Sequence, residues 1–280
     1  MCNAATNLKI SLAAIMCGLM ISCSSSDKEK ATALYTEAEN LMNSGDYEQA
    51  QTLLDSIDKA YPGEVDVRRQ GIHLRPQLIE KLTLRQLSAT DSLLATCQLQ
   101  SDSLGKYIIK VDNPIEPYFV YAGFEGKSPV ASPGVYARIT PDGQFYIISS
   151  VNRSIGSTSV AISMPDGTSA QTATVAYDGE RNDKQGGAEV ITFMQSECDT
   201  IGALAQQHPD AKFTLTFTGL KQWSMPLPDN QLKALATMHE AAGLIKDMKV
   251  LQIRKTQLEK QLELSRSQQA RTFNEESASE

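Results

Sequence analysis

Histidine, a common metal ligand and general base, occurs three times in the chain, at His73, His208 and His239. Each lies in a different segment, and there is no His-Glu-x-x-His pattern and no Cys-x-x-Cys pair. A transition-metal site needs several such ligands brought together by their spacing. We therefore predict no metal site.

The chain also lacks the short motifs that bind phosphates or present a nucleophile. It has no phosphate-binding glycine loop and no Gly-x-Ser-x-Gly turn. Asp142 and Asp166 each stand in a Pro-Asp-Gly sequence, which is typical of a β-turn rather than of a catalytic carboxylate pair. We predict no cofactor, no catalytic residues and no enzymatic activity.

One stretch carries oxygen-bearing side chains at offsets similar to those of a calcium loop: Asp178, Glu180, Asn182 and Glu189. Asp183 stands where that loop needs a glycine for its sharp turn, and the flanks have the pattern of strands rather than helices. The sequence favours a solvated hairpin loop over a calcium site.

Aromatic residues are the candidates for ligand binding. Solvent-facing rings on a β-sheet are what a glycan or peptide site requires. Alternation alone does not say whether such a face is exposed, and a ring at the end of a sheet can instead seal the junction with a helix. The candidate binding residues are Tyr118, Tyr121, Tyr136, Tyr146 and Trp223.

The composition is that of an ordinary globular protein. Of 280 residues, 41% are hydrophobic and 21% are charged. The net charge of −7, with no cluster of lysine and arginine, argues against a nucleic-acid partner.

The first residues contain Lys9, an apolar run from Ile10 to Ile21, and then Ser22-Cys23. This run of 12 residues is shorter than the about 20 that a membrane-spanning helix needs. The segment resembles the signal of bacterial lipoproteins. The resemblance implies a signal peptide over residues 1–22, a lipidated Cys23 that anchors the chain to a membrane, and a linker over residues 23–30. Ser24 implies the outer membrane of the cell envelope, and the leaflet stays open.

Residues 31–105 have the pattern of helices. Leu34 and Ala38 share one face, Gly45 and Asp46 suit a tight turn, and Pro62 ends a second helix. This hairpin resembles a single tetratricopeptide repeat, a family that binds peptides and proteins. The alternative is a hairpin that simply packs on the helices that follow, because one repeat has no long concave groove. Pro76 is expected to end or kink the next helix.

Residues 106–228 change to a period of two, which is typical of strands. Two Pro-Asp-Gly turns indicate hairpins, so we predict an antiparallel, β-sandwich-like domain inserted between helices, an α+β fold. A short helix is expected from Glu197 to Gln207 with Ser196 as its cap. The predicted strands are Tyr107–Val111, Tyr118–Phe124, Gly134–Thr140, Gln144–Val151, Thr158–Met164, Gln171–Tyr177, Ala188–Gln195 and Lys212–Leu220.

Residues 229–273 predict a long helix with a coiled-coil-like seam, followed by a disordered tail over 274–280. The partner of the seam is either the helix expected over residues 77–104, in an antiparallel stalk, or a second copy of the chain. The seam residues are Leu244, Met248, Leu251, Leu258 and Leu262.

Cys97 and Cys198 are the cysteines left once Cys2, Cys17 and Cys23 are assigned to the signal and the lipid. They could form a disulfide in an oxidising compartment or remain two buried thiols.

The predicted function is that of a lipid-anchored cell-envelope protein acting as a non-enzymatic scaffold or adaptor for other envelope proteins, through the hairpin and the seam. The alternative is a module whose β domain binds a glycan or a peptide. A scaffold predicts an uncovered coiled-coil patch, whereas a binding module predicts a solvent-facing aromatic cluster.

Overall fold

The computed structural model describes residues 26–277, so the predicted signal peptide and Cys23 lie outside the described residues. The chain divides into two compact units. Unit 1 is Ala95–Val250, and unit 2 comprises residues 26–94 and 251–277. The division falls within two long helices, α3 (Val65–Gly105) and α5 (Asp229–Ser277), so each helix contributes to both units. The predicted α+β fold is confirmed.

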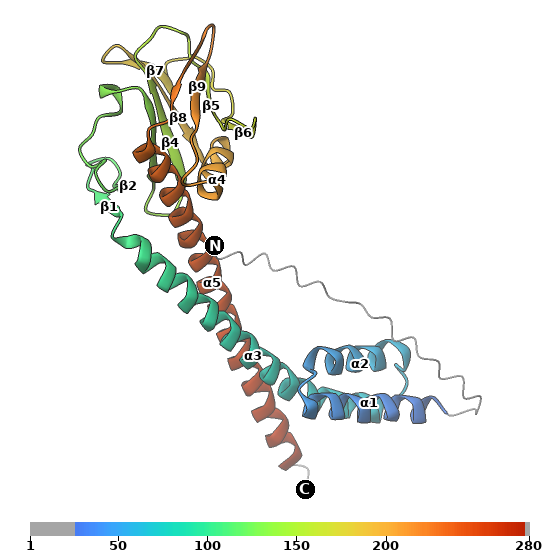
Figure 1. Ribbon diagram of the computed structural model, residues 1–280. Coiled ribbons are helices and arrows are strands. Elements are labelled where there is room, and N and C mark those ends of the chain that lie inside the picture. The colour runs from blue at the N-terminus through green and yellow to red at the C-terminus, as the bar shows by residue number, and fades with distance from the viewer. Residues whose placement is uncertain (1–25, 278–280) are drawn as a thin grey trace. The chain divides into compact units, whose positions relative to one another are not determined.

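In unit 2, helices α1 (Asp27–Ser44) and α2 (Tyr47–Ala60) form the predicted hairpin (Figure 1). Gly45 takes a φ of 91°, the left-handed conformation that the turn requires. Helix α1 begins at Asp27, inside the predicted linker, because Ser26 and Glu29 form a reciprocal capping box. Asp46 precedes α2 but makes no side-chain capping hydrogen bond.

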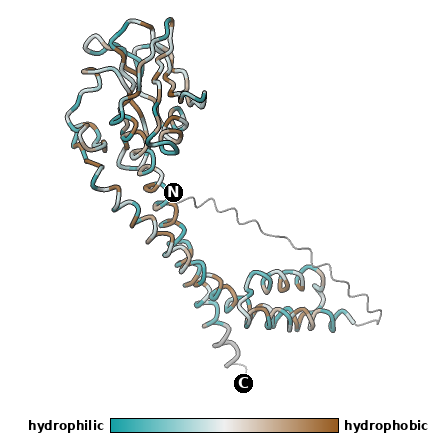
Figure 2. Tube along the Cα trace, viewed as in Figure 1, coloured by the Kyte–Doolittle hydropathy of each residue, from teal (hydrophilic) through white to brown (hydrophobic). Residues whose placement is uncertain are grey.

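The hairpin packs on the first part of α3. Leu54, Ile57, Leu74 and Leu78 share one apolar core, and hydrophobic and hydrophilic positions alternate along α1 and α2 (Figure 2). The hairpin thus packs on the helix that follows it, as the alternative to a peptide-binding repeat predicts.

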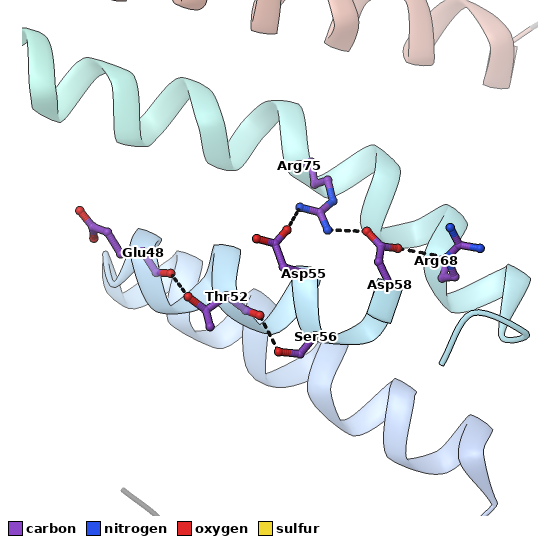
Figure 3. Close-up of polar contacts among 7 residues, drawn as sticks. All are labelled: Glu48, Thr52, Asp55, Ser56, Asp58, Arg68 and Arg75. Atoms are coloured by element: carbon purple, nitrogen blue, oxygen red, sulfur yellow. Dashed lines mark hydrogen bonds and ion pairs between the residues drawn. The ribbon is translucent and has the colours of Figure 1, made fainter. Parts of the chain in front are cut away.

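An arginine on α3 fixes the hairpin by ion pairs. The Arg75 guanidinium lies 2.7 Å from Asp55 Oδ1 and 2.6 Å from Asp58 Oδ2, both on α2, and Arg68 Nε lies 3.1 Å from Asp58 Oδ1 (Figure 3). The two arginines hold the pKa of Asp58 below its usual value, against the opposing effect of its partial burial.

Pro76 was expected to end or kink the helix, and it does not end it. Helix α3 continues through it from Val65 to Gly105. Proline removes the hydrogen bond to the carbonyl four residues earlier, here that of Ile72. Ile72 is 60% exposed, so water can reach this turn of the helix. The carbonyl of Pro76 itself accepts a hydrogen bond from Gln269 Nε2 at 3.3 Å.

The partner of the seam in unit 2 is α3, in antiparallel orientation. Lys255 Nζ lies 2.7 Å from Asp91 Oδ1, and Arg266 Nε lies 2.8 Å from Glu80 Oε1, so rising numbers on α5 meet falling numbers on α3. This confirms the antiparallel pairing of the two helices within one chain. The seam residues Leu244, Leu251 and Leu258 are buried, and Met248 and Leu262 are half-buried.

The α3 side of this pair contains buried threonines. Thr83 is fully buried and its hydroxyl has no hydrogen-bond partner, whereas the hydroxyl of Thr90 donates to the Gln86 carbonyl at 2.8 Å. A buried hydroxyl without a partner destabilises the folded state because it has lost its hydrogen bonds to water.

We expect Thr83→Val to raise the unfolding free energy of unit 2 by about 1 kcal/mol, because valine has the same shape without the hydroxyl. Chemical denaturation followed by far-UV circular dichroism measures the change. Thr90→Val is the matched control. It should not raise the unfolding free energy, because it removes a hydroxyl that already has a hydrogen-bond partner. A loss of stability in Thr83→Val as large as in the control would contradict the assignment.

Unit 1 contains two antiparallel sheets, in which the predicted turns at Gly143 and Gly167 are present with φ values of 88° and 93°. The first has the order β1-β2-β3-β4-β8-β7 and the second β10-β9-β5-β6. Their bounds are β1 Ile108–Val111, β2 Tyr118–Tyr121, β3 Gly134–Ile139, β4 Phe145–Val151, β5 Ser159–Ser163, β6 Ser169–Gln171, β7 Asn182–Gln185, β8 Ala188–Met194, β9 Thr214–Thr218 and β10 Gln222–Pro226.

Three strand predictions need correction. The strand predicted over Gln171–Tyr177 is instead β6, which ends at Gln171, because the Pro165-Asp166-Gly167 turn returns the chain at once into pairing with β5. Strands β7 and β10 were not predicted, since all four residues of Asn182–Gln185 are polar and Gln222–Pro226 contains a proline.

Both sheets share one core with helices α4 (Asp199–Gln207) and α5, and β4 lies in the interior of the first sheet. Ser196 does not cap α4, because the 3₁₀ turn Gln195–Glu197 comes first and Cys198 takes the cap position. Leu235 and Met238 of α5 are fully buried in this core. The first turns of α5 therefore belong to the β domain, beyond the predicted boundary at residue 228.

The structure also tests the predicted C-terminal tail and the two alternatives for Cys97 and Cys198. Helix α5 continues to Ser277, so residues 274–277 are helical rather than part of a disordered tail. Cys97 and Cys198 are both buried thiols and form no disulfide with each other. Burial raises the pKa of Cys198 to about 12, so this thiol is protonated and unreactive at neutral pH.

Candidate ligand-binding site

Three of the candidate tyrosines lie on one face of the first sheet. Arg138 pairs directly with Tyr146 across β3 and β4, Tyr136 pairs with Ile148, and Val120 of β2 pairs with Arg138. Because alternate residues of a strand point to the same face, Tyr118 shares this face with Val120. We call this set the aromatic face; its members are Tyr118, Val120, Tyr136, Arg138, Tyr146 and Ile148.

The opposite face of the same strands forms the core. Val135, Ile139, Phe145 and Ile147 are at most 1% exposed. By contrast, Tyr118, Arg138 and Tyr146 on the aromatic face are each only half-buried. Strand alternation could not show whether this face is exposed. In the structure, Tyr118, Arg138 and Tyr146 are partly exposed to water.

Tyr118, Arg138 and Tyr146 line a shallow recess of about 190 Å³. The Arg138 guanidinium carbon lies 4.0 Å from the centroid of the Tyr118 ring, within the range of a cation–π contact. Burial raises the pKa of the Tyr146 hydroxyl, while the nearby positive charge of Arg138 opposes the rise. The hydroxyl is therefore neutral at physiological pH and can both donate and accept a hydrogen bond.

The loop between β1 and β2 forms the rim of the recess. Asn113, Ile115 and Glu116 from this loop line it together with Thr140 at the end of β3. The Asn113 side-chain oxygen accepts a hydrogen bond from the Ile115 amide at 2.9 Å, which orders the loop. Ile115 is 96% exposed, an unusual position for a large apolar side chain. The recess thus combines two aromatic rings, a cation, a carboxylate and an exposed aliphatic group.

Tyr121 and Tyr136 do not belong to the recess. Tyr121 falls on the opposite face by alternation and stacks on Tyr107, with ring centroids 5.9 Å apart. Tyr136 is 6% exposed, and its hydroxyl donates to the Ser132 carbonyl at 2.8 Å, under the short turn Pro129–Ala131. Tyr136 lines a second recess of about 320 Å³ together with Phe124 and other residues.

Trp223 lies in the second sheet, on β10. Its ring stacks on Phe217 at 5.6 Å between centroids, and the Arg153 guanidinium carbon lies 4.8 Å from its centroid. Trp223 is half-buried and packs against the core of unit 1. These contacts assign it to packing rather than to the recess.

Two of the side chains at calcium-loop offsets, Glu189 and Asn182, make hydrogen bonds to the backbone instead. Glu189 is 3% exposed, and its carboxylate accepts hydrogen bonds from the amides of Gly156 at 3.1 Å and Ser157 at 2.8 Å. Asn182 Nδ2 donates to the Ser157 carbonyl at 2.7 Å. Within residues 26–277, no three histidine, cysteine, aspartate or glutamate side chains come close enough together to hold a metal ion.

The main residue that sequence reasoning missed is Arg138. A signal was available: Val135, Ala137 and Ile139 alternate as the core side of the strand, which leaves Tyr136 and Arg138 on the other side. The register set by the Pro141-Asp142-Gly143 turn then places Arg138 opposite Tyr146. Glu116 and Ile115 had no comparable signal, because a loop conformation does not follow from alternation.

Comparison of the chain with protein-family models, with curated proteins and with solved structures finds no match. The geometry of the site therefore carries the functional argument.

Proposed function

We propose that this protein is a non-enzymatic, lipid-anchored protein of the cell envelope whose β unit binds a glycan at the recess of the aromatic face. The observation that carries the proposal is the half-exposed group of Tyr118, Arg138 and Tyr146 around one recess. Aromatic rings offer a sugar ring an apolar surface, and the polar groups beside them can bond its hydroxyls.

A glycan fits this surface better than a peptide does. Peptides that bind sheets commonly add a strand to a free edge, where unpaired backbone groups are available. Strands β2, β3 and β4 are interior strands of the first sheet, with a partner on each side. A ligand over the recess therefore cannot pair with these strands as an added strand, and the side chains that line the recess supply most of its contacts.

The scaffold role was predicted from the seam and from the single repeat. The buried stripe of α5 in unit 2 packs against α3, so the seam does not favour the scaffold role over glycan binding. Membrane attachment rests on the lipoprotein-like sequence at Cys23. Among residues 26–277, no helix combines the length and the apolar character that crossing a bilayer requires.

The test is binding of the soluble chain, with Cys23 replaced by alanine, to an array of neutral and acidic oligosaccharides. We expect specific binding that falls about tenfold or more in Tyr118→Ala/Tyr146→Ala, since each ring contributes about 1 kcal/mol or more of contact. The matched control is Tyr177→Ala, which removes a tyrosine that is 47% exposed and lies outside the recess. Absence of binding to every glycan, or equal binding by the double variant, would contradict the proposal.

A further inference from the structure

The charge of Arg138 is not balanced by an ion pair. Several other arginines pair with carboxylates, such as Arg75 with Asp55 and Arg266 with Glu80. Among the residues that the structure describes, no carboxylate forms an ion pair with Arg138, which lies half-buried against Tyr118 instead. A partly buried cation without a counter-ion favours an anionic ligand.

Arg138 stacks on Tyr118 and shares a side-chain hydrogen bond with Tyr146, and its other N–H groups stay available. A guanidinium over an aromatic ring uses its charge and its flat face, whereas its five N–H groups lie in its plane. Those N–H groups match the two oxygens of a carboxylate in a bidentate pair. Arg138 at the wall of a recess is thus held in place by two tyrosines, while its remaining N–H groups can take an anion.

The other lining groups narrow the anion to one that also carries hydroxyls. Glu116 lines the same recess and supplies acceptor oxygens, which a hydroxyl can use and a bare anion cannot. Thr140 and Asn113 add further polar groups. The recess, at about 190 Å³, is smaller than the roughly 300–1,000 Å³ of sites that enclose a drug-sized ligand, so it suits one ring-sized group.

From these features we infer that the recess recognises an acidic sugar residue, with the sugar carboxylate on Arg138 and the sugar hydroxyls on Glu116 and its polar neighbours. This inference rests on the proposed glycan-binding function and specifies its ligand class. Acidic glycans should then bind more tightly than neutral ones of the same backbone, and the preference should weaken as salt is raised.

The experiment compares uronic-acid and sialic-acid oligosaccharides with the same oligosaccharides after reduction of each carboxyl group to an alcohol. Affinities are measured by calorimetry on the soluble chain. We expect carboxyl reduction to weaken binding about tenfold or more, the effect of losing a charge-assisted hydrogen-bond pair. Arg138→Gln should remove this difference, so that acidic and reduced glycans bind the variant with equal affinity, and Arg138→Lys should retain part of it.

Arg153→Gln is the control, because Arg153 also lies over an aromatic ring but belongs to the Trp223 cluster. Equal affinity for acidic and reduced glycans would overturn the acidic-sugar inference and leave the glycan-binding function standing. Binding to neither class would overturn both. If Arg138→Gln does not fold, the carboxyl-reduction series on the unaltered chain still decides the inference.

Discussion

Replacing Glu189 with glutamine is expected to lower the unfolding free energy of unit 1 by about 2–4 kcal/mol, the range for disrupting a buried, charge-assisted hydrogen-bond pair. Both carboxylate oxygens accept from backbone amides, at Gly156 and Ser157. Glutamine has one acceptor oxygen and an NH₂ group, so one of the two amides would face a donor in a buried place.

The effect is expected to be large because this contact joins two parts of the fold. Glu189 belongs to β8 of the first sheet, whereas Gly156 and Ser157 precede β5 of the second. The segment is packed tightly from the other side as well: a Cβ at Gly219 would lie 2.0 Å from the Gly156 carbonyl oxygen. The loop cannot move away from the substituted side chain without disturbing β9.

Trp223 reports on this unfolding, since it is the one tryptophan of the chain and lies in unit 1. Urea titrations followed by its fluorescence give the unfolding free energy. Glu180→Gln is the control, because Glu180 is exposed and its side chain lies outside the buried pair. A Glu189→Gln variant as stable as this control would show that the carboxylate does not hold the two sheets together.

The double substitution Leu251→Glu/Leu258→Glu should release the C-terminal half of α5 from α3. Both leucines are less than 10% exposed, at 9% and 6%. Two carboxylates would enter an apolar contact without partners, and the lost packing adds to the cost, for a total of about 4 kcal/mol or more. Helix content measured by far-UV circular dichroism should fall, and amides of residues 251–277 should exchange faster.

The matched control for this variant is Ile253→Glu/Leu264→Glu on the same helix. Those side chains are 59% and 60% exposed, so the same two charges are added to the water-facing side. We expect a change within about 0.5 kcal/mol for the control, as is usual at exposed positions. Equal loss of helix in both variants would mean that charge, and not burial of the seam, causes the effect.

Much of the fold follows from periodicity in the sequence. The spacing of the apolar seam residues predicts the stripe of α5 that faces α3 in unit 2, and the two Pro-Asp-Gly turns predict their hairpins. The elements that periodicity did not predict depend on contacts between residues far apart in the sequence. Strand β7 is polar along its length and forms because Asn182 is buried against Ser157 and Val175. Pro76 lies within α3, which the sequence alone did not predict.

The candidate site was predictable only in part. Tyr118 and Tyr146 were identified by their residue type and by strand alternation, and both line the recess. The same reasoning grouped them with Tyr121 and Tyr136, which fall on the opposite face and under a covering turn. Arg138 completes the site through a cross-strand pair, and a register of that kind needs both strands to be placed.

The most direct test of glycan binding at the aromatic face is an NMR titration of the soluble chain with its nine tyrosines labelled. The ligand is the tightest-binding oligosaccharide of the array. The account predicts that the ring signals of Tyr118 and Tyr146 shift on addition of the glycan, while that of exposed Tyr177 does not. Shifts confined to tyrosines outside the recess, or the same small shift at every tyrosine, would contradict it.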